Sequence, residues 1–229
     1  MIQINKLTKI LYGGGHRVDI LNDIDLTVPS GQFAAITGAS GSGKTTLLSL
    51  IAGLDTPTSG SVVIDGKDIT KMNEDELAVL RGERFGFIFQ NFHLIPTLTA
   101  VENAALSAEL NGTPGAHKKS EDLLGIVGLA DRFHHYPAQL SGGEQQRLCL
   151  ARAFINEPDI VLADEPTGNL DSKNSGRIID LITELHQVKN ATIILVTHEQ
   201  HITQKTQRIL TMADGRIIQD ISPAKDLSG

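Results

Sequence analysis

Cysteine is nearly absent from this sequence, since Cys149 is the single one among 229 residues. One cysteine excludes a disulfide within the chain. The lack of disulfides is typical of proteins in reducing compartments, so we expect an intracellular location. Cys149 lies between Leu148 and Leu150 in a stretch of helix-forming residues. We therefore expect it to be a small buried apolar residue and not a reactive thiol.

Long apolar runs are also missing. The longest, residues 47–54 and 193–196, fall far short of the roughly 20 apolar residues that a transmembrane helix needs. The N-terminus alternates like a β-strand and has no basic segment followed by an apolar run, so no signal peptide is predicted. We expect any membrane role to be exercised from the cytoplasmic side, through a partner.

Basic residues are outnumbered, with 20 Lys and Arg against 27 Asp and Glu and a net charge of −7. A broad nucleic-acid surface needs an excess of Lys and Arg to neutralise phosphates, so we expect no nucleic-acid partner. The length suits one large domain, or one domain with an inserted subdomain.

Short apolar strands between helical segments predict an α/β fold. Residues 33–37 and 160–163 are apolar except for Thr37 and do not alternate, which is typical of a parallel sheet covered by helices on both faces. The clearest helix is residues 172–187, where apolar residues recur at helical spacing. Further strands are expected at residues 2–7, 20–28, 61–64, 85–89, 192–196 and 208–212, followed by a hairpin turn at Asp214 and Gly215. From about residue 99 to 154 helix formers dominate, which predicts a helical insertion.

A phosphate-binding loop is predicted at residues 38–45, which read Gly-Ala-Ser-Gly-Ser-Gly-Lys-Thr and fit G-x-x-x-x-G-K-[ST]. The motif lies between a predicted strand and a predicted helix, as phosphate binding requires. Glycines let backbone N–H groups turn toward a phosphate, and the helix adds its positive N-terminal end. Lys44 is expected to contact the β- and γ-phosphates, and the Thr45 hydroxyl to ligate Mg²⁺. The expected nucleotide contacts come from Gly38, Ser40, Gly41, Ser42, Gly43, Lys44, Thr45 and Thr46.

Two adjacent carboxylates, Asp164 and Glu165, end the apolar run at residues 160–163. Ligands of open α/β sheets bind at such strand ends. Asp164 is expected to hold Mg²⁺, directly or through a water, and Glu165 to deprotonate the attacking water. The alternative is that both merely solvate a strand end, but the phosphate loop favours the catalytic interpretation.

The run Leu-Ser-Gly-Gly-Glu-Gln at residues 140–145 precedes a predicted helix at 144–156. Ser141 and two glycines at a helix start can bind an anion. They can equally form a simple helix cap. The residues alone leave both interpretations open.

Together, and in their order along the chain (residues 38–45, 140–145 and 164–165), the three motifs resemble those of the nucleotide-binding subunit of ATP-binding-cassette (ABC) transporters, over essentially the whole chain. The resemblance implies an α/β fold: a P-loop NTPase (RecA-like) core with a mostly parallel sheet, an N-terminal antiparallel β region and an inserted α-helical subdomain. It implies a single domain over residues 1–229, with the core at about 1–90 and 157–229 and the helical subdomain at about 91–156.

The resemblance assigns roles to more residues. Tyr12 resembles the aromatic that stacks on adenine, and Gln90 the glutamine that touches Mg²⁺ and the attacking water. His198 resembles the switch histidine that contacts the γ-phosphate. The alternatives are a surface aromatic, a loop amide and a histidine satisfied at a strand end. The implied catalytic residues are Glu165, His198, Gln90 and Lys44, and the implied Mg²⁺ ligands are Thr45, Gln90 and Asp164.

Two positions depart from the family pattern. Residues 168–171, which match the D-loop, read Gly-Asn-Leu-Asp where Ser-Ala-Leu-Asp is commoner, and Glu199 stands where Asp is usual. Neither departure removes a catalytic group, so the resemblance implies an active ATPase.

In this family the signature motif of one chain closes on the ATP held by another, which implies a homodimer around two ATP. Residues contacting ATP in trans would be Ser141, Gly142, Gly143, Glu144 and Asp171. A membrane permease is the implied partner, docking near residues 91–98, although that segment could instead be a core-packing loop.

Residues 54–60, 85–90 and 163–171 are similar to the MacB/LolD group of export and lipoprotein-releasing ATPases. Since the sequence ends at Gly229, we expect the permease on a separate chain and this protein on the inner face of the cell membrane. The alternatives are an amino-acid importer ATPase and a soluble ABC ATPase acting on nucleic acid. A GTPase is disfavoured because the guanine-specific N-K-x-D motif is absent, and the signature run at residues 140–145 has no place in a GTPase or a phosphate-loop kinase.

Overall fold

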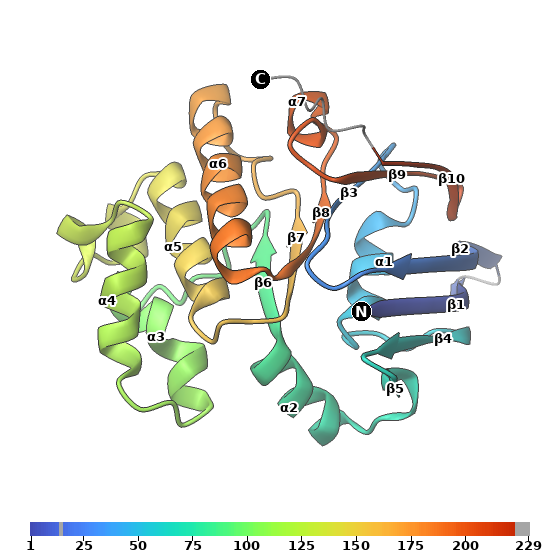
Figure 1. The fold of residues 1–229 in the computed structure, drawn as a ribbon, viewed down its shortest axis with the longest axis horizontal. Helices are drawn as coiled ribbons and strands as arrows, with labels where there is room; N and C mark the ends of the chain where they lie inside the picture. Colours follow the sequence, from blue (N-terminus) through green and yellow to red (C-terminus); the bar gives the residue numbers. More distant parts are fainter. Residues whose placement is uncertain (14–15, 223–229) are drawn as a thin grey trace. The chain divides into compact units, whose positions relative to one another are not determined.

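The computed structural model describes residues 1–13 and 16–222, so residues 223–229 of the expected single domain lie outside it (Figure 1). The chain forms two compact units, Met1–Leu77 with Thr192–Gly229, and Ala78–Ala191. The helix α2 (Glu74–Arg84) carries the chain from the first unit into the second.

The first unit contains an antiparallel sheet of order β2-β1-β4-β5. Its strands are β1 (Ile2–Gly13), β2 (His16–Val28), β4 (Ser59–Ile64) and β5 (Lys67–Asp68). Along β1 Ile2 and Ile4 are buried, because alternate side chains of a strand point to the same face. A register shift between Ile4 and Leu7, where Lys6 has a φ of 44°, makes Leu7 the next buried residue. This sheet confirms the expected N-terminal antiparallel region.

The same unit holds the strands β3 (Phe33–Gly38), β8 (Thr192–Val196), β9 (Arg208–Ala213) and β10 (Arg216–Ile221). β3 lies between β8 and β9 and runs parallel to both. The predicted hairpin joins β9 to β10, and Asp214 and Gly215 adopt the left-handed backbone angles that a tight turn needs, with φ of 48° and 71°. The helices α1 (Lys44–Ile51) and α7 (Gln200–Thr203) complete the unit.

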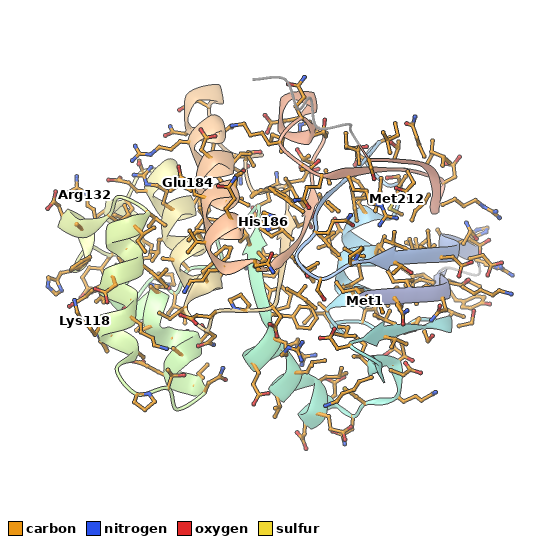
Figure 2. The ribbon with its side chains drawn as sticks, in the orientation of Figure 1. Met1, Lys118, Arg132, Glu184, His186 and Met212 are labelled. Carbon is orange, nitrogen blue, oxygen red and sulfur yellow. The ribbon has the colours of Figure 1, made fainter. Side chains whose placement is uncertain are left out.

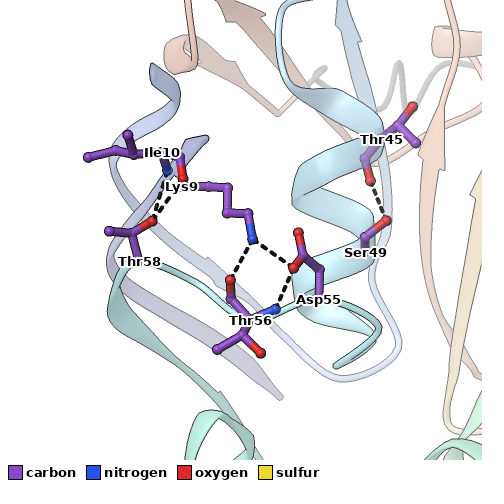
Figure 3. A network of polar contacts seen from close by, with 7 residues as sticks. All are labelled: Lys9, Ile10, Thr45, Ser49, Asp55, Thr56 and Thr58. Carbon is purple, nitrogen blue, oxygen red and sulfur yellow. Dashed lines mark hydrogen bonds and ion pairs between the residues drawn. The ribbon is translucent and has the colours of Figure 1, made fainter. Parts of the chain in front are cut away.

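A buried lysine fastens β1 to the loop that follows α1 (Figure 3). Lys9 Nζ donates hydrogen bonds to Asp55 Oδ1 at 2.7 Å and to the Thr56 carbonyl at 2.8 Å. Close by, the Ile10 amide donates to Thr58 Oγ1 at 2.9 Å. These contacts fix β1, which contains Tyr12, to the loop that follows α1 in the sequence.

The second unit combines a parallel strand pair with long helices. β6 (Phe85–Phe89) and β7 (Ile160–Asp164) pair in parallel, with Phe89 opposite Asp164. The helices α3 (Ala100–Leu110), α4 (Ala116–Ile126) and α5 (Gly142–Phe154) pack against one another, and α6 (Ser172–Lys189) follows β7 (Figure 1). Single 3₁₀ turns precede α5 at Ala130–Arg132 and Pro137–Gln139.

The observed elements agree with most sequence expectations. Parallel pairs occur where apolar strands were predicted, and within the described chain residues 99–154 hold no strand. α5 begins at Gly142, two positions before the predicted start at Glu144, because Ser141 acts as its N-cap. Cys149 is fully buried, and burial raises the pKa of its thiol to about 11, so it is not a reactive thiol. Over residues 1–13 and 16–222, no helix is long and apolar enough to cross a membrane.

Candidate active site

The phosphate loop has a backbone that only glycine can supply at two of its positions. Gly38 has a φ of 145°, and a Cβ there would lie 2.2 Å from the carbonyl oxygen of Met212. Met212 is part of β9 and is labelled in Figure 2. Gly43 has a φ of 99°, and a Cβ there would lie 2.8 Å from the Ile20 carbonyl oxygen. The left-handed angles and the close approach of β2 and β9 therefore both require glycine.

The lysine of the motif is held against the loop. Lys44 is only 6% exposed, and its Nζ donates to the carbonyls of Gly38 at 2.9 Å and Ala39 at 2.8 Å. The buried Ser42 hydroxyl has no hydrogen-bond partner among the described residues. A buried polar atom without a partner is costly unless a ligand satisfies it. The glycine cradle, the lysine and this hydroxyl therefore fit a phosphate group.

The same unit places His198 near the phosphate loop. The Thr197 amide donates to the Ile36 carbonyl at 3.1 Å, which continues the pairing of β8 with β3. His198 therefore follows β8 at the same sheet end at which Gly38 closes β3, and its side chain is exposed. Tyr12 is 77% exposed, near the end of β1 and opposite Arg17. Its ring is accessible for stacking.

The second unit brings Gln90, Asp164 and Glu165 to one end of the β6–β7 pair. Gln90 follows Phe89, which pairs with Asp164, and Glu165 is the next residue. Glu165 has a φ of 43°, which is uncommon for a residue with a side chain. It begins a turn in which the Gly168 amide donates to the Glu165 carbonyl at 3.1 Å.

The turn at residues 141–144 is a complete capping box. Ser141 Oγ accepts from the Glu144 amide at 3.3 Å, and Glu144 Oε2 accepts from the amide and the hydroxyl of Ser141, both at 2.8 Å. Glu144 Oε1 also accepts from Arg132 Nε at 3.0 Å. The Ser141 hydrogen bonds, and to a smaller extent Arg132, lower the pKa of Glu144 to about 2. Ser141 is thus a helix cap, and the helix N-terminus that it fixes remains a suitable anion site.

The two glycines of this turn lie against the D-loop segment. A Cβ on Gly142 would be 3.5 Å from Leu170 Cδ2, and one on Gly143 would be 2.9 Å from Asn174 Oδ1. Asn174 is in turn held by Asp171, whose Oδ2 accepts from Asn174 Nδ2 at 2.8 Å. The residues expected to act in trans are therefore connected by contacts within the second unit, where Ser141 and Asp171 are exposed and Gly143 is buried.

The segment after Gln90 is fastened to the helices by its backbone. Arg152 donates to the carbonyls of Phe92 at 2.7 Å and His93 at 2.6 Å. Asn103, which is 1% exposed, accepts from the Ile95 amide at 2.8 Å and donates to the Ile95 carbonyl at 3.0 Å. Ile95 itself is 38% exposed.

Three residues that support this site were not predicted from the sequence: Arg132, Asn174 and Asn103. Arg132 bonds to Glu144, 12 residues further along the chain, and Asn103 to Ile95, 8 residues before it. No sequence pattern marks such pairs. The S-x-x-E spacing of Ser141 and Glu144 does carry a signal, since it is the spacing of a capping box.

Mg²⁺ binds through few protein ligands together with substrate phosphates. The described chain holds no group of three or more His, Cys, Asp or Glu side chains suited to a metal ion. A Thr hydroxyl, an amide and a carboxylate beside a nucleotide fit that chemistry, and Thr45, Gln90 and Asp164 are of these types.

Comparison with known proteins identifies the sequence pattern. A family model described as ABC transporter matches residues 21–168. The macrolide export ATP-binding/permease protein MacB of Brucella abortus (strain 2308) is 44% identical over 222 residues, which cover 96% of this chain and 34% of that protein. The chain thus spans about a third of the length of this relative. An uncharacterised ABC transporter ATP-binding protein of Methanocaldococcus jannaschii, MJ1508, is 46% identical over 97% of this chain and all of its own length.

Solved structures agree with these sequence relatives. The ATP-binding cassette MJ0796, in a dimeric post-hydrolysis state bound to ADP and Pi, superposes with a TM-score of 0.89 at 37% identity. The similarity covers 97% of this chain and 98% of that one. A second dimeric structure of MJ0796 gives the same TM-score at 39% identity.

Proposed function

This chain belongs to the ABC transporter family, and we infer that it is the ATP-binding and ATP-hydrolysing component of a membrane exporter. The observation that carries the proposal is the phosphate loop, where glycine-only backbone, the buried Lys44 and the unpartnered Ser42 hydroxyl form an anion cradle. The signature run at residues 140–145 separates this proposal from other phosphate-loop enzymes.

The nucleotide binds to the phosphate loop, with its adenine at Tyr12. The loop amides of residues 38–46 surround the β-phosphate, Lys44 neutralises β- and γ-oxygens, and Tyr12 stacks on adenine. Thr45, Gln90 and Asp164 are the side chains that hold Mg²⁺. When bound, the ion offsets negative charge on the transferred phosphoryl group.

Hydrolysis requires a base and a positioned water. Glu165 accepts a proton as the water oxygen bonds to the γ-phosphorus, and the bond from that phosphorus to the β–γ bridging oxygen breaks, which gives ADP and phosphate. Gln90 orients the water, and His198 contacts the γ-phosphate. These roles rest on the family pattern at each position.

A second copy of the chain completes the site. Ser141, Gly142 and Gly143 of one chain contact the γ-phosphate bound by the other, with Glu144 and Asp171 beside them. The helix N-terminus of α5, fixed by its capping box, supplies positive potential to that phosphate. The dimeric structures of MJ0796 support a homodimer for this chain.

The membrane partner is a permease that docks at residues 91–98, the segment between Gln90 and α3. The proposal includes a RecA-like core at about 1–90 and 157–229 and a helical subdomain at about 91–156. Export rather than import is supported by the MacB relatives, which are named as macrolide export proteins. The protein would then be peripheral on the cytoplasmic face of the membrane.

Replacing Glu165 by Gln tests the catalytic assignment. The variant keeps its shape and its nucleotide contacts but loses the proton acceptor, so turnover should fall by about 10²–10⁴-fold. ATP affinity, measured with a fluorescent analogue, should stay within about threefold of the wild-type value, because the substitution removes no proposed contact with the nucleotide. A tenfold change would require the loss of about 1.4 kcal/mol of binding free energy. Glu184→Gln, an exposed glutamate on α6, is the matched control. Wild-type phosphate release from Glu165→Gln would contradict the assignment.

A further inference from the structure

The two positions at which the D-loop departs from the commoner family sequence both contact Gln90. A Cβ on Gly168 would lie 2.8 Å from Gln90 Nε2 and 3.2 Å from Gln90 Cδ, so the absent side chain is what leaves space for the glutamine amide. The neighbouring Asn169 donates from Nδ2 to the Gln90 carbonyl at 3.0 Å. A serine and an alanine at these positions would fill that space and remove that donor.

These contacts connect the turn that contains Glu165 to the segment that follows Gln90. Gly168 closes the turn that Glu165 begins, through the bond from its amide to the Glu165 carbonyl at 3.1 Å. Gln90 precedes Phe92 and His93, whose carbonyls Arg152 holds. Gly168 and Asn169 therefore join the turn of the proposed base to the segment of the proposed partner contact.

We propose that Gly168 and Asn169 are positioning residues for Gln90. Asn169 holds the Gln90 backbone beside the Glu165 turn, and Gly168 leaves the space that the Gln90 side chain occupies there. The inference rests on the proposed function, because it assumes that Gln90 orients the attacking water. Neither residue touches nucleotide in this account; both act through Gln90. A glycine–asparagine pair at this place thus sets Gln90 in a position that a serine–alanine pair cannot maintain by the same contacts.

The test is a double-mutant cycle on ATP hydrolysis. Asn169→Ala removes the donor, and the loss of one neutral hydrogen bond corresponds to about a two- to tenfold fall in kcat. KM for ATP should not change, because the bond does not involve the nucleotide. In a Gln90→Ala background the same substitution should lower kcat no further, since the side chain that it positions is gone. Gly168→Ala should behave alike, because its Cβ displaces the Gln90 amide.

The matched control is Asn111→Ala. Asn111 is also exposed, and its Nδ2 also donates to a backbone carbonyl, that of Gly82 at 2.7 Å. This variant should retain wild-type kcat in both backgrounds. Both alanine variants should melt close to the wild-type temperature, which separates a positioning effect from a loss of fold.

Hydrogen exchange of the nucleotide-free chain gives a readout without turnover. Peptides that contain Gln90 should exchange faster in Asn169→Ala than in the wild type or in Asn111→Ala. Unchanged exchange would overturn the inference, and so would an equal loss of kcat in both backgrounds. If Glu165→Gln stops turnover while Asn169→Ala retains full kcat, the positioning role fails and the proposed function stands. If Glu165→Gln turns over normally, the assignment of Glu165 as the base fails by itself, and the exchange of the Gln90 peptides still tests the positioning role.

Discussion

Glu144 illustrates how one side chain can fix the backbone of a helix start through contacts within its own chain. Its two carboxylate oxygens are taken up by Ser141 and Arg132. The sequence expectation placed Glu144 among the residues that contact ATP in trans, and that contact stays a proposal. The geometry within the chain gives it a second duty, which is to fix Ser141 and the first turn of α5.

The lowered pKa of Glu144 predicts a pH-dependent stability. Its pKa falls from the usual 4.5 to about 2, mainly through the Ser141 amide and hydroxyl. A depressed folded-state pKa stabilises the fold above the unfolded pKa, and this stabilisation is lost as pH falls through the folded value. Wild type should therefore exceed Glu144→Gln in unfolding free energy at pH 7, and the difference should shrink from about pH 4.5 downward.

Urea unfolding of both proteins between pH 7 and pH 3 measures that difference. Glutamine can still complete a capping box, so the comparison isolates the charge. A gap between the two proteins that is constant across the range would contradict the role of the ionised carboxylate.

Among the elements, the strands were the most predictable and α2 the least. β6 and β8 occupy the residues expected from their apolar runs, Phe85–Phe89 and Thr192–Val196. α2 was not predicted, because Leu77 is its one buried residue and no apolar periodicity marks it. The departures at Gly168 and Asn169 were visible in the sequence, but their contact with Gln90 depends on strand pairing that brings distant residues together.

At the same scale, the segment at residues 91–98 allows its surface to be altered without altering its backbone. Asn103 and Arg152 hold the backbone, while Ile95 is partly exposed. Ile95→Asp should therefore fold normally but reduce membrane recruitment about tenfold or more, as loss of an apolar contact in an interface does. Sedimentation of the protein with membranes that contain its permease measures this.

Val188→Asp is the control, since Val188 is 77% exposed on α6, away from residues 91–98 in sequence. It should leave recruitment unchanged. If Ile95→Asp also sediments like the wild type, the segment is a packing loop and the partner docks elsewhere.

For the whole molecule, the central claim is that the phosphate loop is half of a site whose other half belongs to a second copy. In the second unit Ser141, Gly142 and Gly143 lie at the start of α5, and Gly142 and Gly143 are close to the D-loop segment that contains Asp171. A chain that works in this way needs an intact loop in one copy and an intact signature turn in the other. Variants that each break one half can therefore repair one another only if the site is shared.

Gly142→Asp breaks the signature half. A Cβ at Gly142 meets Leu170 at an ordinary 3.5 Å, so the variant should fold, while its carboxylate repels a γ-phosphate. Glu165→Gln breaks the catalytic half. In a mixed dimer one site combines the intact Glu165 of the first variant with the intact signature turn of the second.

ATP turnover of these two variants, measured separately and mixed at varying ratio, tests the claim most directly. Each variant alone should show near-background turnover, and the mixture should reach a maximum at comparable amounts of the two chains. Turnover that equals the weighted mean of the separate variants at every ratio would contradict it, because each chain would then contain its own complete site.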